Sequence, residues 1–278
     1  MTAGKAHRAL RIAAALGAAA FAVEAGASSD PCRPPRLETA AQAAANERLE
    51  LLLADGRLIR LAGVESPSAR GAEPRFMESA SEDFALWTSS PIAIFTLKAQ
   101  PDRWGRQEAR AFIAEKGFAP DLLPSLSEAV IDAGFARVDP SSETRPCLDR
   151  LYAAEARARA ARRGLWADPA FAVLDAGKPL DSQAQAGKIA IVEGRVASVR
   201  AGRGVTFVNL GDGSPRSPSL TLGREALRAM QREGVEPEAL AGRKIRARGV
   251  LDLRAGPRIE VAGPNAIEML EDARSAGR

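Results

Sequence analysis

In the first half of the chain, apolar residues recur at every second position in several short runs, which predicts strands that are half-buried in a sheet. Leu49, Leu51 and Leu53 form the first run. The Asp55-Gly56 pair that follows predicts a hairpin turn into a return strand. With the same reasoning we expect further strands at 57–64, 92–96 and 109–113.

Helical spacing separates these predicted strands. Phe76, Ala80 and Phe84 recur at i, i+4 and i+8 after Pro74, a residue favoured in the first turn of a helix. A second helix is expected after the capping box Ser125-Leu126-Ser127-Glu128, with its end at Gly134. A third is expected over 148–163, with Glu155 and Arg159 paired at i, i+4. Strands with helical cover predict a small antiparallel barrel of α+β class.

The second half repeats the strand pattern after a segment with few large apolar residues, 172–186, which we interpret as a linker. Strands are predicted at 189–199, 205–210, 219–222, 244–253 and 257–261, with a helix at 224–232 before the last two. Three strands, a helix and two strands is the order of an OB barrel. The expected organisation is a lead-in at 28–44, a first domain at 45–171, a basic OB-like domain at 187–271 and a tail at 272–278.

Length and composition agree with two globular domains, since 278 residues with 46% hydrophobic and 27% charged residues exclude wholesale disorder. Charge is unevenly divided. Residues 45–172 carry 17 basic and 19 acidic side chains, a net charge of −2, whereas 186–270 carry 14 and 9, a net charge of +5. The basic surplus weakly favours a polyanionic partner, but 33 of the 39 basic residues are arginine, which genomic base composition alone can explain.

The N-terminus has the features of a signal peptide over residues 1–27. Lys5, Arg8 and Arg11 are followed by an apolar run from Ile12 to Val23 and by small residues up to Ala27. That run of 12 residues is too short to span a bilayer, and no later stretch approaches a transmembrane length. We therefore expect an exported protein, periplasmic or secreted; an uncleaved N-terminal anchor is the alternative.

Because an exported protein reaches an oxidising compartment, we expect Cys32 and Cys147 to form a disulfide rather than remain two free thiols. The single histidine, His7, lies inside the predicted signal peptide. Without a histidine in the mature chain, catalytic triads, Cys–His dyads and zinc sites are excluded. No haem or nucleotide cofactor is expected, so any catalysis would depend on carboxylates, arginines and a hard metal ion.

Two arginines mark the candidate site. Arg60 begins the stretch R-L-A-G-V-E-S-P, and Arg106 ends the turn D-R-W-G-R. Two guanidinium groups brought together can clamp one phosphate, because each offers a rigid fork of donors. The null hypothesis for each is an ordinary surface or structural arginine.

With A-G-F-A-R-V at 133–138 and A-E-A-R-A-R-A-A-R-R-G-L-W after it, these motifs make residues 45–170 resemble the thermonuclease (staphylococcal nuclease-like) family. The resemblance implies a five-stranded OB barrel with three helices and calcium-dependent hydrolysis of DNA and RNA. It implies that Arg60 and Arg106 contact the phosphate and stabilise charge in the transition state. It also implies that Glu65 stands where the family has a metal-binding aspartate, and that Trp104 can stack on a base or sugar.

The acids match this family less well. Ser68 stands where the family has the glutamate that activates water, and Leu49 where it has a second metal-binding aspartate. Glu47 falls on a less critical acid, and a register change could bring Glu47 or Glu50 to the site. Glu73, Glu78 and Glu82 could supply a base, although their helical spacing is typical of a solvated face. Calcium is the possible cofactor, but only Glu65 is retained among these acids. Two hypotheses stay open: a nucleic-acid-binding protein with or without hydrolysis, and an inactive homologue that serves protein or envelope contacts.

The second domain offers a weaker hypothesis. Lys244, Arg246 and Arg248 alternate along one predicted strand, which places them on one face where they could bind nucleic acid. Phe207 is the only aromatic residue after 186, so base stacking has little support. A solvated basic strand or a protein-docking surface would explain the same pattern.

Overall fold

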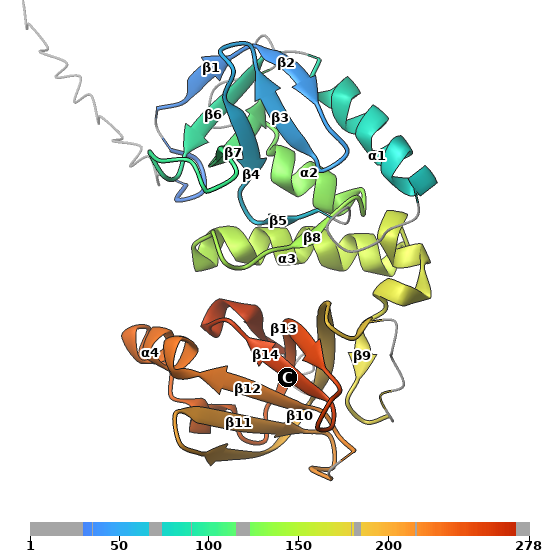
Figure 1. Ribbon diagram of the computed structural model, residues 1–278, viewed down its shortest axis with the longest axis vertical. Coiled ribbons are helices and arrows are strands. Elements are labelled where there is room, and N and C mark those ends of the chain that lie inside the picture. Colours follow the sequence, from blue (N-terminus) through green and yellow to red (C-terminus); the bar gives the residue numbers. More distant parts are fainter. Residues whose placement is uncertain are drawn as a thin grey trace, which may run out of the picture.

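Two β-sheet bodies are stacked on each other, with helix α3 (Arg145–Ala160) lying between them (Figure 1). The computed structural model describes residues 30–34, 36–66, 74–89, 91–114, 123–178, 180, 185–214 and 216–270. The expected signal peptide and C-terminal tail lie outside these described residues. Within them, no helix is long and apolar enough to cross a membrane.

Among the described residues, the first body contains eight strands and three α-helices. Its strands are β1 (Glu38–Ala40), β2 (Gln42–Ala45), β3 (Glu50–Leu53), β4 (Leu58–Leu61), β5 (Val64–Glu65), β6 (Ile92–Thr96), β7 (Arg106–Ile113) and β8 (Arg137–Val138). Its helices are α1 (Pro74–Trp87), α2 (Leu126–Asp132) and α3, followed by short 3-10 helices at Gly164–Ala167 and Pro169–Phe171.

The first sheet has the strand order β1-β6-β7-β4-β3-β2, with β4 and β7 parallel. Only Ala41 separates β1 from β2, so the two act as one bent strand that pairs with β6 on one side and with β3 on the other. The bend closes the sheet into the predicted five-stranded barrel. Its first strand lies at 38–45, where a lead-in was expected, because a run rich in Ala lacks the hydrophobic contrast that marks a strand.

The predicted helices are present, with shifted ends. Ser125 caps α2 as expected, since its side chain accepts a hydrogen bond from the Glu128 backbone N–H. Helix α3 begins three residues earlier than predicted, with Pro146 in its first turn, and ends before Arg162, whose φ is +51°. Gly134 allows the end of α2 to touch the end of α3, because a Cβ there would lie 2.2 Å from the Arg163 carbonyl oxygen.

The second body is a closed OB barrel with the circular order β10-β11-β12-β14-β13-β10, as predicted. Its elements are β9 (Leu174–Asp175), β10 (Ile189–Ala201), β11 (Val205–Leu210), β12 (Ser219–Gly223), α4 (Arg224–Arg232), a 3-10 helix (Pro237–Leu240), β13 (Lys244–Asp252), β14 (Arg258–Val261), a 3-10 helix (Pro264–Ala266) and β15 (Ile267–Leu270). Two edge strands were not predicted. Strand β9 pairs with β10 from inside the expected linker, and β15 pairs with β13.

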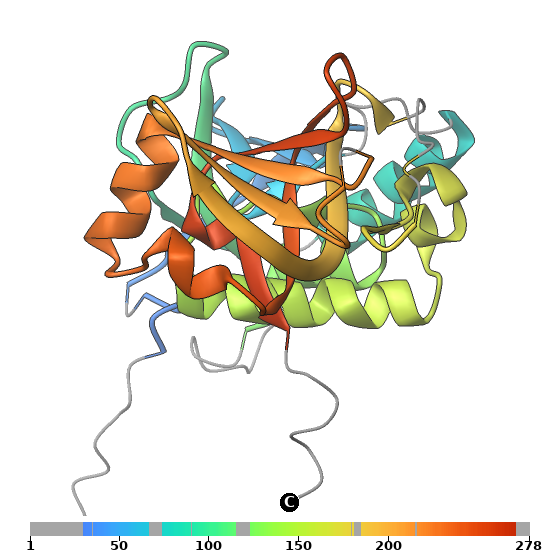
Figure 2. The same ribbon diagram turned by 90° about the horizontal axis from the view of Figure 1, so that it is seen from below.

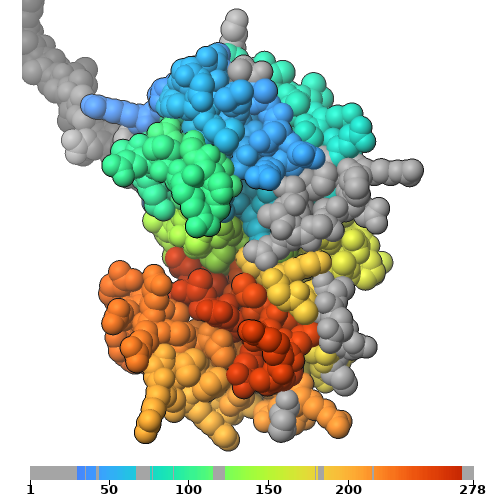
Figure 3. All heavy atoms as spheres, in the orientation of Figure 1, coloured from blue at the N-terminus to red at the C-terminus, as the bar shows by residue number. Residues whose placement is uncertain are grey.

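The two bodies are joined along α3. Tyr152 donates a hydrogen bond to the Asn265 carbonyl oxygen at 2.5 Å, and Arg145 donates to the Ile267 carbonyl oxygen at 3.2 Å. Seen from below, the second barrel covers much of the first body, and α3 runs along one side of it (Figure 2). In the space-filling view, the segment around residue 100 (green) lies at the lower edge of the first body, with yellow-green atoms between it and the second body (Figure 3).

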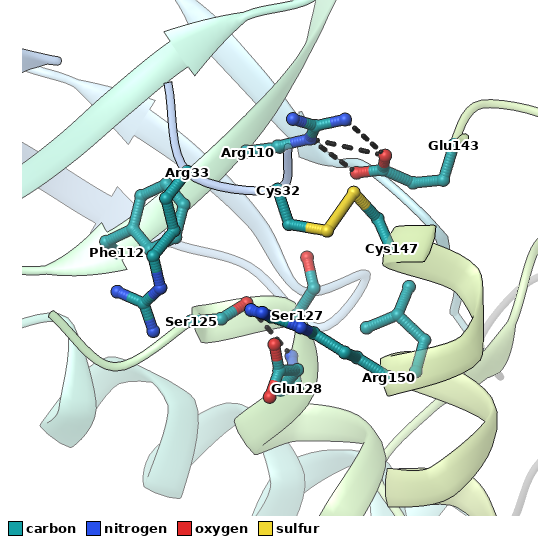
Figure 4. Close-up of a pocket in the computed structure, with 11 residues that line it drawn as sticks. Cys32, Arg33, Arg110, Phe112, Ser125, Ser127, Glu128, Glu143, Cys147 and Arg150 are labelled. Atoms are coloured by element: carbon teal, nitrogen blue, oxygen red, sulfur yellow. Dashed lines mark hydrogen bonds and ion pairs between the residues drawn. A yellow bond between two sulfur atoms is a disulfide. The ribbon is translucent and has the colours of Figure 1, made fainter. Parts of the chain in front are cut away.

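The predicted disulfide is present. Cys32 is bonded to Cys147, with their Cα atoms 5.4 Å apart, and so ties the entry segment to α3 (Figure 4). Arg110 lies beside it, donating to the Pro31 carbonyl oxygen at 2.8 Å and pairing with Glu143 at 2.7 Å. The cavity between these side chains measures about 20 Å³, room for no more than a water molecule, so it is packing space rather than a ligand site.

Candidate functional site

The site is built on one outer face of three adjacent strands, β3, β4 and β7. Arg60 lies opposite Glu50 across the β3–β4 pairing and opposite Glu108 across the β4–β7 pairing. Arg106 lies two residues before Glu108 on β7. Because side chains alternate along a strand, Arg106 shares this face with Arg60. The barrel therefore brings together the two arginines that stand 46 positions apart in the sequence.

Arg60 is held by carboxylates from two directions. Its Nη2 donates to Asp139 Oδ2 at the end of β8, and its Nη1 lies 3.9 Å from Glu108 Oε1. The side chain keeps 32% of its surface exposed. Since a guanidinium has five N–H donors, part of its donor set remains available to an anion.

Arg106 is fixed by the tight turn before it. Gly105, with a φ of +79°, lets the chain reverse so that Asp102 can accept hydrogen bonds from the Trp104 and Arg106 backbone N–H groups. The Arg106 guanidinium bonds Asp102 at 2.8 Å and Glu50 at 3.2 Å. Although desolvation opposes it, the hydrogen bonds from the Arg106 side chain and from the Arg106 and Trp104 backbone N–H groups lower the pKa of Asp102 to about 2. The arginine is thus oriented before any ligand arrives.

The Trp104 ring lies against two guanidinium groups, those of Arg103 and Arg106. The Cζ of Arg103 is 3.9 Å from its ring centroid, and the Cζ of Arg106 is 4.7 Å away. The indole is nevertheless 60% exposed. An exposed aromatic ring that cation–π contacts hold in place is a suitable platform for stacking a base.

Two hollows flank the arginine pair, and both arginines line each of them. The first, of about 420 Å³, also contains Arg48, Glu50, Glu65, Trp104, Asp139 and Ile189 in its wall. The second, of about 730 Å³, is lined further by the 98–102 segment and Glu108. Either volume is sufficient for a nucleotide-sized ligand.

Glu65 and Glu50 are the two acids nearest to the expected catalytic positions. Glu65 is 8% exposed and lies opposite Arg137 in the β5–β8 pairing, with a side-chain ion pair of 3.3 Å. Glu50 is 5% exposed and contacts Arg106. It reaches the site without the register change that we considered, because Leu49, with a φ of +57°, turns into the core and leaves Glu50 on the arginine face.

These carboxylates do not fit a calcium ion. Calcium takes six to eight oxygen ligands. Across the described ranges, no three of the His, Cys, Asp and Glu side chains converge in a way that could hold a metal ion. Glu50 instead pairs with Arg106, and Glu65 pairs with Arg137, so a guanidinium group neutralises each of these carboxylates.

The other acids considered from sequence lie elsewhere. Glu47 is exposed in the turn before β3, and Glu78 and Glu82 are exposed on α1; none of them lines the two hollows. Ser68 and Glu73 lie outside the described residues. The structure therefore offers no replacement base among the acids it describes on α1.

The basic strand of the second domain differs from the expected binding face. Lys244, Arg246 and Arg248 do lie on one strand, β13, and Lys244 is exposed. Arg246, however, is paired with Glu193 and Glu268, and Arg248 is 3% exposed between Glu155 and Glu268. Carboxylates therefore neutralise both Arg246 and Arg248, and Arg248 in addition faces the first body. Neither arginine is available to nucleic acid.

Several residues of the site were missed from sequence, among them Asp139 and Arg137. Asp139 pairs with Arg60, and Arg137 pairs with Glu65. Both flank Val138, the last residue of the A-G-F-A-R-V motif, which we had used only for the family resemblance. The sequence signal that could have identified them is a charged residue on either side of Val138, next to the apolar Phe135 and Ala136.

Comparison with known protein families identifies a domain in the first body. The staphylococcal nuclease homologue family matches residues 58–168, from the strand that carries Arg60 to the end of the first 3-10 helix after α3. No curated protein matches the chain. The match includes both arginines, Glu65 and Trp104. Residues 58–168 of the chain therefore form a staphylococcal nuclease homologue domain.

Proposed function

We propose that this protein binds the phosphodiester backbone of a nucleic-acid strand between Arg60 and Arg106. The observation that carries the proposal is the shared face of the two arginines, which line one hollow of about 420 Å³. A phosphate would exchange for part of the carboxylate contacts that now hold both guanidinium groups. Arginine suits this role because its fork matches two anionic oxygens at once.

Trp104 would contribute the stacking contact. Its exposed ring lies in the same wall as both arginines, so a phosphate on the arginines leaves a neighbouring base within reach of the indole. Stacking tolerates every base, whereas base-edge contacts select among them. We therefore propose binding with little sequence preference, to a single strand whose bases are accessible.

The proposal does not include cleavage. Hydrolysis in this fold would need a general base, whose loss alone costs about 10²–10⁴-fold in rate. It would also need a metal site, which the described carboxylates do not fit. Glu65, the acid expected to bind metal, faces Arg137 instead.

We also propose that the protein acts outside the cytoplasm. The positive and apolar segments of residues 1–27 support export, and the Cys32–Cys147 disulfide supports an oxidising compartment.

Binding of a labelled single-stranded oligonucleotide, measured by fluorescence anisotropy in chelator and then in calcium, tests the function. Arg60→Ala and Arg106→Ala should each weaken binding by about 10- to 100-fold, since a charged hydrogen bond contributes about 1.5–3 kcal/mol. The matched control is Arg254→Ala, an exposed arginine of the second barrel whose partner is Asp252.

Equal affinity in both site variants and the wild type would contradict the proposed site. Calcium-dependent cleavage that both substitutions abolish would contradict the proposal of binding without hydrolysis. An oligonucleotide that does not bind at all would favour a protein or envelope contact as the role of this domain.

A further inference from the structure

The proposed phosphate site lies against the second barrel. Ile189, the first residue of β10, belongs to the wall of the same hollow as Arg60, Glu65 and Trp104. All the other described residues of that wall come from the first body. The second barrel therefore borders the site, and its contacts with the first body bear on how the site is held.

The strongest of these contacts is made by Arg248 of β13. Its Nη1 donates to the Val138 carbonyl oxygen at 3.1 Å and to Glu155 Oε1 at 3.0 Å. Its Nη2 donates to Glu155 Oε2 and to Glu268 Oε1, both at 2.9 Å. The guanidinium carbon also lies 4.6 Å from the centre of the Tyr152 ring. A buried arginine with this many partners is held in one orientation.

Val138 is held through both of its backbone polar groups. Its N–H donates to Glu155 Oε1 at 2.9 Å, and its carbonyl oxygen accepts from Arg248. Glu155 itself is fully buried on α3. Burial alone would raise the pKa of Glu155, but Arg248, the Val138 N–H and Arg159 hold that pKa below its ordinary value. The carboxylate that anchors β8 thus stays ionised.

The two neighbours of Val138 contact the site. Arg137 pairs with Glu65, and Asp139 pairs with Arg60. A displacement of β8 would move both counter-charges together. Arg60 would then lose its closest carboxylate, since Glu108 is 3.9 Å away.

We propose that Arg248 is a positioning residue for the phosphate site, and that the second barrel acts on the site through β8. The pathway runs from Arg248 to Val138, and from there to Asp139 and Arg60. This inference rests on the proposed function for its effect on binding, but it also makes a structural prediction that is independent of any ligand.

The first test is Arg248→Lys in the full chain. Lysine keeps the charge near Glu155 and Glu268 but lacks the fork that reaches Val138 at the same time. We expect binding of a single-stranded oligonucleotide to weaken about tenfold, within the usual range of coupling between sites. Arg145→Lys is the matched control, because Arg145 also bonds the other body but does not touch β8.

A double-mutant cycle with Asp139→Asn distinguishes positioning from general stability. If Arg248 acts through Asp139, the lysine substitution should cause little further loss of affinity in the Asp139→Asn background. Independent losses that multiply in the double variant would overturn the proposal. Should Arg248→Lys not fold, the pair Arg248→Met with Glu155→Gln removes the charges of Arg248 and Glu155, keeps Arg246 as the partner of Glu268 and leaves an acceptor for the Val138 N–H.

Hydrogen exchange provides the readout that needs no ligand. In Arg248→Lys, amide protection should fall in peptides that cover β8 and β5, the strand that carries Glu65. A loss confined to 264–270 of the second barrel would overturn the proposal, because it would show that Arg248 only joins the two bodies. A wild-type protein that does not bind the oligonucleotide would contradict the proposed function, and this exchange pattern would still decide the role of Arg248.

Discussion

At the scale of single residues, the site is a network in which positive and negative charges alternate. Arg60 faces Asp139, Arg106 faces Asp102 and Glu50, and Glu65 faces Arg137. Opposite charges hold one another in place, so the guanidinium groups are oriented without a ligand. The same pairing means that a phosphate must compete with carboxylates, and its affinity will depend on how many contacts it replaces.

Trp104 provides a prediction at this scale. Trp104→Ala should weaken binding of a single-stranded oligonucleotide by about 5- to 100-fold, because stacking of a base on an aromatic ring contributes about 1–3 kcal/mol. Trp104→Phe should retain most of the affinity. Anisotropy titration measures both, and equal binding by the alanine variant would exclude stacking on this ring.

Glu155 provides a pH prediction. Its pKa is lowered in the folded protein from an ordinary value of 4.5, against the effect of burial, by Arg248 and the Val138 N–H. The stability from its charge is therefore fully present above pH 4.5 and is lost as the pH falls below that value. Urea unfolding at a series of pH values should show a weaker decrease in acid for Glu155→Gln than for the wild type. Identical pH dependence in the two proteins would contradict this contribution.

At the scale of elements, short strands position the residues of the site. Strand β8 has only two residues, yet it pairs with β5, contacts α3 through Glu155 and reaches β13 through Arg248. Strand β13 is in turn shared by the barrel and the interface. Its pairing with β10, β14 and β15 leaves its Arg246 and Arg248 side chains facing other charges instead of solvent.

Gly249 of β13 tests how tightly that strand is packed. A Cβ at this position would lie 1.9 Å from the Glu260 carbonyl oxygen of β14, and a backbone atom cannot move aside as a flexible side chain can. Gly249→Ala should lower the free energy of unfolding by about 3 kcal/mol, the upper end for overpacking. The control is Gly263→Ala, where a Cβ meets nothing within 4 Å. Urea denaturation compares the two, and equal stability would contradict the packing argument.

At the scale of the whole molecule, the disulfide and the buried ion pairs join segments that are distant in sequence. The Cys32–Cys147 bond closes a separation of 115 residues and fixes the entry segment beside α3. On its other side, α3 meets the second barrel through Tyr152, Arg145 and Glu155. Helix α3 is therefore the element through which both constraints reach the site.

The disulfide provides the third stability prediction. In the chain-entropy account, a closed loop of this length stabilises the folded protein by about 5 kcal/mol. Cys32→Ser with Cys147→Ser should lower the free energy of unfolding by about that amount in urea. The reduced wild-type protein should match the double variant, and a reduced protein as stable as the oxidised one would contradict the assignment.

Much of the fold was predictable because its signals are local. Alternating leucines, the Asp55-Gly56 turn, the Ser125 cap and the Pro74 helix start all follow from the residues nearest to them. Strands β1 and β2 were missed because their small residues show no contrast between faces. Strands β9 and β15 were missed because edge strands depend on the partner that accepts them.

The sequence by itself determined the staphylococcal nuclease-like barrel, the OB order of the second body, the cysteine pair and the two arginines of the site. These depend on spacing and residue type, which a linear chain displays. Only the tertiary structure decided that Glu50 and Asp139 complete the site and that Arg248 is buried at the interface. A charge can be read from sequence, but its partner is chosen by which strands come together in space.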